Sequence, residues 1–202
     1  DLSGVHTYPL VSRASRARSE DFARPVERGG SFKAWFDSLP AILGARDLRR
    51  VVQAIVQSRA GGRPVVWGLG AHVIKTGVPP VLIDLMKRGY VSAVALNGAG
   101  IIHDFEIALS GATSEDVDET LGPGRFGMAD ETGRLLNAAI TEGVGRGLGI
   151  GQAAASWLLG MNPPHASRSL LAAAARLEVP VTVHVAIGTD IIHMHPDASG
   201  AA

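Results

Sequence analysis

The fold is predicted by the stretch from Pro64 to Gly111, PVVWGLGAHVIKTGVPPVLIDLMKRGYVSAVALNGAGIIHDFEIALSG. Pro64–Leu69 and Val91–Leu96 are short apolar runs of the kind that form buried strands of parallel sheets. Between them, Pro79-Pro80 suits the first turn of a helix and Lys87-Arg88-Gly89 suits its last turn. The stretch predicts a repeated strand–helix unit in which a glycine-containing turn follows each strand.

A third strand is predicted near the C-terminal end of the sequence, where Val181–Ile187 forms another apolar run. These runs are too uniformly apolar for strands that are buried on one face only. We therefore expect an α/β fold in which three central strands share one parallel sheet with helices on both faces.

Composition narrows the classes of function. Hydrophobic residues make up 46% of the 202 residues, the formal net charge is +0, and there is no cysteine. A neutral chain has no overall field that would attract nucleic acid. No apolar run approaches the ~18 residues of a membrane span. The absence of cysteine excludes disulfides and thiolate sites, so we expect a cytoplasmic protein.

Two domain features are predicted. Residues 1–30 are rich in Ser and Arg and form an N-terminal arm, whereas residues 31–202 form the α/β domain, which we expect to be truncated at its C-terminal end. The glycine-rich segment Gly143–Gly151 follows a predicted helix rather than a strand. It is interpreted as a flexible connection and not as a phosphate-binding loop.

Candidate ligand-binding residues follow the first two strands. Gly70 lies after the first strand, and Asn97-Gly98-Ala99-Gly100 lies between the second strand and a helix. Glycines allow a ligand to approach the backbone closely, and the N terminus of a helix favours negative charge. Since the ends of parallel strands share one edge of a sheet, both turns are expected to line one site.

The helix after the second strand carries His103-Asp104-Phe105-Glu106, which places His103 and Glu106 on one face. One interpretation is that the acids only stabilise the start of this helix. The other is an acid/base pair with an amine-binding carboxylate. A third possibility is a zinc or iron site, which would indicate a metal-dependent hydrolase, since several metal-ligating side chains could gather there: His72, His103, Asp190, His193 and His195. A nucleotide-binding protein without catalysis is the remaining alternative.

The runs HVIKTGVPPVLIDLMKRGYVSAVALNGAG (His72–Gly100) and VPVTVHVAIGTDIIHMHP (Val179–Pro196) resemble, in order and spacing, two motif regions of deoxyhypusine synthases. The resemblance implies a Rossmann-like three-layer sandwich, an NAD cofactor and a homotetramer. It also implies transfer of an aminobutyl group from a polyamine. By position, the residues placed beside NAD are Ala71, His72, Gly98, Ala99, Gly100 and Thr189.

By the same resemblance, Asp190 corresponds to the aspartate of the family's Thr-Asp pair. His195 corresponds to an aspartate that binds the substrate amine in the family. Two adjacent glutamates of the family are replaced by Ile102 and His103. We therefore expect His103 to be the general base, because histidines change charge near neutral pH. Asp104 or Glu106 would orient it or bind the substrate ammonium, and the loop from Ile191 to Pro196 would close the pocket.

Overall fold

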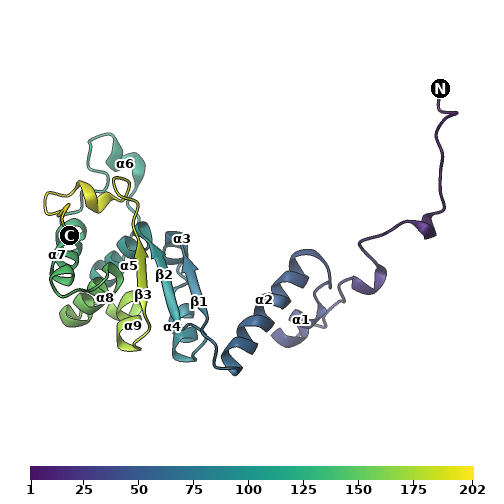
Figure 1. Ribbon diagram of the computed structural model, residues 1–202, viewed down its shortest axis with the longest axis horizontal. Coiled ribbons are helices and arrows are strands. Elements are labelled where there is room, and N and C mark those ends of the chain that lie inside the picture. Colours follow the sequence, from purple (N-terminus) through teal and green to yellow (C-terminus); the bar gives the residue numbers. More distant parts are fainter. The chain divides into compact units, whose positions relative to one another are not determined.

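The computed structural model describes residues 1–202, which form two compact units, Asp1–Gln57 and Ser58–Ala202. The two units are described separately. None of the helices combines the length and the apolar character that a bilayer span requires. Figure 1 shows the elements along the chain.

The first unit contains no buried residue. The guanidinium group of Arg49 donates hydrogen bonds to the carbonyl oxygens of Phe36 (2.9 Å) and Leu39 (2.6 Å) and so joins its two α-helices. Its elements are two 3-10 turns, η1 (Leu10–Ser12) and η2 (Ser19–Asp21), followed by α1 (Phe32–Ser38) and α2 (Leu43–Ala60), whose last three residues belong to the second unit.

The second unit is an α/β structure built on three strands: β1 (Val66–Leu69), β2 (Ala93–Asn97) and β3 (Val181–His184). Its α-helices are α3 (Ala71–Lys75), α4 (Pro79–Lys87), α5 (Gly98–Ser110), α6 (Val117–Leu121), α7 (Asp130–Gly145), α8 (Ile150–Met161) and α9 (Leu170–Arg176). Two 3-10 turns complete it, η3 (Ala166–Arg168) and η4 (Ile191–Met194).

The three strands form one open parallel sheet in the order β1-β2-β3. The prediction that the three apolar runs share a parallel sheet is therefore confirmed. In register, Gly68 lies beside Ala95, which lies beside Thr182. Because all three strands point the same way, their C-terminal ends lie at one edge, where α3, α5 and the segment after β3 begin.

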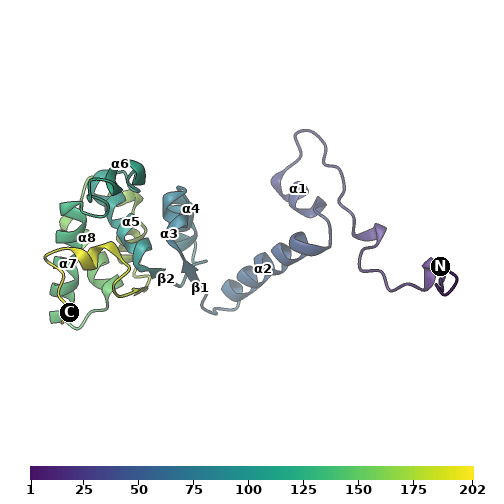
Figure 2. The ribbon, with the colours of Figure 1, turned by 90° about the horizontal axis from the view of Figure 1, so that it is seen from above.

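Within the second unit, helices cover one face of this sheet, so the predicted helical layer on the other face is not confirmed. Val94 and Leu96 are 1% exposed beneath the helices, whereas Val66 on the other face is 65% exposed. Figure 2 shows α3, α4, α5 and α8 on the same side of the strands. We call the other side the open face; the strand residues that point to it are Val66, Gly68, Ala93, Ala95, Thr182 and His184.

The two faces of the sheet differ in side-chain size. Several residues that made the runs look uniformly apolar are Gly68, Ala93 and Ala95, whose side chains present little surface to bury. The burial pattern in β2 alternates, as in a strand that packs on one side only. The sequence thus overstated the apolar surface on the second face.

The predicted connection Gly143–Gly151 joins α7 to α8, and the glycines at its two ends are closely packed. Gly143 ends in contact with Ala153, and Gly151 packs against the carbonyl oxygen of Val181, so both glycines are buried. These glycines have no side chain because α7, α8 and β3 approach one another closely. Gly143 and Gly151 are therefore required for packing, whereas Gly145, Gly147 and Gly149 border open space.

Substitution of Gly151 by alanine should destabilise the protein by about 1–3 kcal/mol, the usual cost of overpacking a core. The added Cβ would overlap the Val181 carbonyl oxygen, and backbone cannot move aside cheaply. Gly160→Ala in the same helix is the matched control, because its Cβ would meet no atom within 4 Å. Removing a helical glycine there should stabilise by roughly 0.5–1 kcal/mol. Urea unfolding that ranks the two variants in the opposite order would contradict this packing.

Candidate functional site

The start of α5 is fixed by its own sequence. The Asn97 side chain accepts a hydrogen bond from the Gly100 amide (2.8 Å), which caps the helix. The helix ends at Gly111, whose φ of +75° suits glycine and whose Cα lies against the ring of His165. The chain then turns back along the helix, which brings Thr113 to the side chains of the preceding turns.

Four side chains from three segments meet there, and we call them the His103–Glu106 cluster: His103, Glu106, Thr113 and Thr132. His103 Nδ1 lies 2.6 Å from the Thr113 hydroxyl, which donates to Glu106 Oε2. The Thr132 hydroxyl of α7 donates to Glu106 Oε1 at 3.0 Å. The predicted pairing of His103 and Glu106 on one helix face is thus present, with 3.6 Å between Nδ1 and Oε2.

The hydrogen bonds fix the tautomer of His103. The single hydroxyl proton of Thr113 is donated to Glu106, so Thr113 Oγ1 can only accept from His103. Nδ1 therefore carries the proton in the neutral ring, and Nε2 carries a lone pair. No hydrogen bond occupies Nε2, and no polar side-chain atom is sealed in the interior without a partner. Nε2 must then reach the surface of the protein.

Glu106 is held as a carboxylate. Burial alone would raise the pKa of Glu106, but hydrogen bonds from His103, Thr113 and Thr132 outweigh it and lower the pKa below its ordinary value. The Glu106 side chain is 19% exposed, so it still reaches the surface. The cluster therefore presents a persistent negative charge next to a histidine.

This carboxylate opens into a cleft of about 720 Å³, which we call the acidic cleft. The charged residues that line it are Glu106, Glu115 and Glu131, and no Lys, Arg or His does so. Glu115 is also tied to the loop above, because its Oε1 accepts from the Gly127 amide (2.6 Å). Thr113 and Thr132 add hydroxyl groups to the wall.

Asp104 does not belong to this cluster, although it is adjacent to His103 in the sequence. Its carboxylate accepts from the Ser169 hydroxyl (2.6 Å) and from the amides of Leu170 (2.7 Å) and Leu171 (2.9 Å), all at the start of α9. It is 0% exposed, and burial raises its pKa against the effect of these hydrogen bonds. Asp104 therefore has a structural role in place of the predicted catalytic one, because both of its oxygens are buried and hydrogen-bonded within the protein.

The predicted cofactor edge is arranged differently from the expectation. The Asp190 carboxylate packs directly on Gly98 at the N terminus of α5 and accepts from the Ala186 amide (2.9 Å). Asn97 already caps Gly100. A negative side chain thus stands where an NAD pyrophosphate would approach, so these residues do not fit that group. Whether NAD binds elsewhere along this edge stays a prediction.

The remaining predicted residues lie apart from the cluster. Gly70 borders open space, His72 is exposed on α3, Ala71 is buried, and Ala99 is half-buried in α5. Thr189 donates to the Ala186 carbonyl oxygen (2.9 Å) within the turn after β3.

His195 packs its ring on Gly133 of α7, and the predicted lid Ile191–Pro196 is anchored there by Asn137, which donates to the Ile192 carbonyl oxygen (3.0 Å). His103, Asp104, Asp190 and His195 therefore do not converge on one point.

A metal site is not formed by the histidines that the sequence suggested. No three His, Asp or Glu side chains gather in a way that could hold an ion. His193 Nδ1 instead accepts from the Gly188 amide (3.3 Å). His-x-His on an extended strand would aim both rings one way, but these residues lie in the 3-10 turn η4 and at its end.

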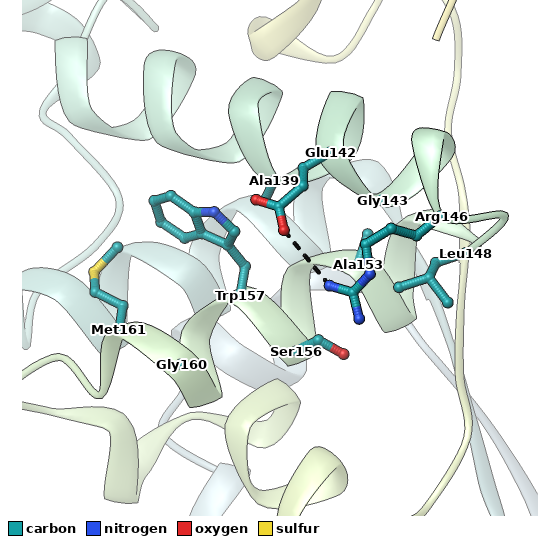
Figure 3. Close-up of a pocket in the computed structure, with 10 residues that line it drawn as sticks. All are labelled: Ala139, Glu142, Gly143, Arg146, Leu148, Ala153, Ser156, Trp157, Gly160 and Met161. Atoms are coloured by element: carbon teal, nitrogen blue, oxygen red, sulfur yellow. Dashed lines mark ion pairs between the residues drawn. The ribbon is translucent and has the colours of Figure 1, made fainter.

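A second cavity, of about 400 Å³, lies between α7 and α8 and contains none of the predicted site residues. Figure 3 shows Trp157 and Met161 on one side of it and the Glu142–Arg146 ion pair (3.5 Å) on the other. This pair is exposed, and Trp157 stacks on the core residue Phe105. The cavity therefore offers apolar surface but no reactive group.

The sequence reading missed Thr113 and Thr132. Thr113 lies ten residues after His103, beyond the end of α5, and Thr132 lies on another helix. The only local signal was Gly111, since a helix that ends in a left-handed glycine can return along its own side. Nothing in the sequence could assign Thr132 to Glu106.

No protein-family model matches the chain, and no curated protein matches it. Among solved structures, the chain is similar to apo ArgZ, an arginine dihydrolase from the ornithine–ammonia cycle in cyanobacteria, with 20% identity and a TM-score of 0.47. The match covers 79% of this chain and 21% of that protein, so the chain spans about a fifth of its length.

The predicted membership of the deoxyhypusine synthase family is wrong. No family model and no curated protein supports it. The predicted NAD-dependent transfer or oxidation of polyamine groups is withdrawn with it. The resemblance rested on short apolar strands and glycine turns, which many parallel sheets share, whereas the family's two glutamates were replaced by Ile102 and His103.

Substitution of Asp104 by alanine should lower the free energy of unfolding by roughly 3 kcal/mol or more, because three buried donors lose their acceptor at about 1–3 kcal/mol each. Asp84→Ala is the matched control, since its exposed ion pair with Arg88 is worth about 0–1 kcal/mol. Urea unfolding measures both. Equal stability of the two variants would show that Asp104 does not hold α9.

Substitution of Glu106 by glutamine should remove an acid-sensitive part of the stability. Since the folded-state pKa of Glu106 is lowered, its contribution is present above the unfolded-state pKa and is lost as the pH falls through the folded-state pKa. The difference in unfolding free energy between wild type and Glu106→Gln should therefore shrink from about pH 7 to about pH 3. Glu142→Gln, on the exposed side of α7, should show no such trend.

Proposed function

We propose that the chain is an enzyme whose acidic cleft binds a small organic cation, and that His103, which lies behind the wall of the cleft, holds Glu106 in place through Thr113. The observation that carries the proposal is the hydrogen-bonded connection from His103 through Thr113 to Glu106 at the wall of the cleft. His103 donates to Thr113 and Thr113 donates to Glu106, so the carboxylate is held in one orientation at the wall of the cleft.

The charge of the cleft supports a cationic ligand. All its charged lining residues are carboxylates, and the lowered pKa of Glu106 keeps that group ionised at neutral pH. An ammonium or guanidinium group could replace the hydrogen bonds that these carboxylates would otherwise make to water. Partial burial strengthens such an ion pair relative to one on an open surface.

His103 does not line the cleft, so it acts on a bound cation only through Thr113 and Glu106. Its Nδ1–H is bonded to Thr113, and the Glu106 carboxylate lies 3.6 Å from Nδ1. Glu106 thus faces the cleft while it is held from behind by hydrogen bonds.

The three-layer sandwich predicted from the sequence also remains a proposal. A parallel sheet normally has helices on both faces, and the open face of this sheet has none. We infer that the functional protein covers this face, which leaves the edge that carries the start of α5 unchanged.

Cation binding can be tested by isothermal titration with butylammonium, 1,4-diaminobutane and guanidinium, with butyrate as the anionic probe. The cations should bind and butyrate should not. Glu106→Gln should weaken cation binding about tenfold or more, since it removes the charge that faces the cleft. Glu142→Gln should leave the affinity unchanged, because Glu142 does not line the cleft.

The role of His103 has a separate readout, the affinity of a variant without its ring. His103→Ala removes the donor that holds Thr113 beside Glu106, so it should weaken cation binding, whereas Glu142→Gln should not. Binding of butyrate instead of cations would contradict the assignment of the cleft, and an unchanged affinity in His103→Ala would contradict the role of His103 alone.

A further inference from the structure

The cavity of about 400 Å³ between α7 and α8 has rigid, mostly apolar walls. On its inner side lie Ala139 and Ala153, which are 1% and 4% exposed, and Ala153 packs on Gly143. The Trp157 indole forms another wall and is held in place by stacking on Phe105, which is 0% exposed. A preformed cavity of this size suits a small molecule with an apolar body.

Two charged residues line this cavity, and they have opposite signs (Figure 3). Glu142 and Arg146 form an ion pair of 3.5 Å in which both side chains are 59% exposed. Asp130 and Arg134 form a pair of the same spacing on α7, at 2.9 Å, but neither of them lines the cavity. Because an exposed pair contributes little to stability, Glu142 and Arg146 can each exchange the other for a group of a ligand.

The cavity also has polar groups that make no hydrogen bond within the protein, the indole N–H of Trp157 and the hydroxyl of Ser156. Neither group is sealed in the interior, since no buried side-chain polar atom lacks a partner. The indole N–H and the Arg146 guanidinium can only donate hydrogen bonds, so they suit a carboxylate. The Glu142 carboxylate can only accept hydrogen bonds, so it suits an ammonium group.

A ligand with a single charge does not match this pair. Glu142 would attract a lone ammonium group that Arg146 repels, and a lone carboxylate would meet the reverse. An α-amino acid carries both groups on one carbon atom, so its carboxylate can bind Arg146 while its ammonium group binds Glu142. Its side chain would then have apolar neighbours among the lining residues, which include Leu148, Trp157 and Met161.

We propose that this cavity binds an α-amino acid with an apolar side chain. The site is separate from the acidic cleft, because the two have no lining residue in common. No histidine or lysine lines it, so Ser156 has no base beside it that could activate its hydroxyl. The site therefore binds the amino acid without altering it.

Isothermal titration of the full chain with L-leucine tests the proposal. Leucine should bind with a Kd below about 1 mM, since it uses both charges and the apolar wall. Competition titrations against leucine then compare analogues at the same site: isocaproate lacks the ammonium group, isoamylamine lacks the carboxylate, and glycine lacks the side chain. Each should compete at least about tenfold more weakly than leucine binds, because each loses one of these contacts.

Substitutions at the cavity locate the bound amino acid. Arg146→Gln and Glu142→Gln should each weaken leucine binding about tenfold, because each removes one charge-assisted hydrogen bond. Glu142→Gln should also bind isocaproate more tightly than the wild type does, since Arg146 then has no competing carboxylate beside it. Trp157→Phe keeps a ring but removes the N–H donor, so it should weaken leucine binding about threefold to tenfold.

Arg134→Gln is the matched control, because it breaks an exposed ion pair on the same helix away from the cavity. It should leave leucine binding unchanged, and circular dichroism with thermal unfolding checks that every variant is folded. The proposal would be overturned if leucine did not bind at millimolar concentration, or if isocaproate or isoamylamine competed as well as leucine binds. Unchanged leucine affinity in both Arg146→Gln and Glu142→Gln would overturn it too, since leucine would then be bound elsewhere.

Discussion

The buried carboxylate of Asp104 holds the second unit together. It lies in the middle of α5 and accepts three hydrogen bonds from the start of α9, sixty-five to sixty-seven residues further along the chain. A carboxylate at 0% exposure is costly unless donors surround it, and the amides at a helix N terminus provide them. Because α9 leads directly into β3, this contact fixes α5 relative to the third strand. The position of every side chain on α5 depends on it.

Because Asp104 is held by α9, residues that are adjacent in the sequence of α5 point in different directions. With Asp104 and Phe105 turned into the core, His103 and Glu106 face away from it, towards the returning loop and α7. The cluster is therefore assembled by three segments, and its proton positions follow from the one hydroxyl proton of Thr113. Glu106 stays ionised although it is partly buried, because its hydrogen bonds lower its pKa by more than the loss of surrounding water raises it. The same packing that hides Asp104 thus presents Glu106 to a cleft.

The two faces of the sheet carry side chains of different size. The helical side of the sheet is filled by large side chains such as Leu96, Ile101 and Phe105, which are almost wholly buried. The other side carries small residues, and the first unit has no core of its own. Large apolar side chains thus lie where helices cover the sheet, and small ones lie where the helices of the second unit do not. The core of the second unit and the surfaces left open thus have different physical requirements.

The sequence by itself determined the three strands and their parallel arrangement, because short apolar runs between helices can pair in few other ways. It also determined the helix that follows Asn97 and the pairing of His103 with Glu106, since both depend on spacing within one helix. It gave a wrong family, because glycine turns after strands recur in many parallel sheets. Only the tertiary structure decided that Asp104 is structural, that Thr113 and Thr132 complete the cluster, and that Asp190 covers Gly98. Those contacts join residues that are distant in the sequence, and which of them form depends on how helices pack. Local spacing carries no information about that packing.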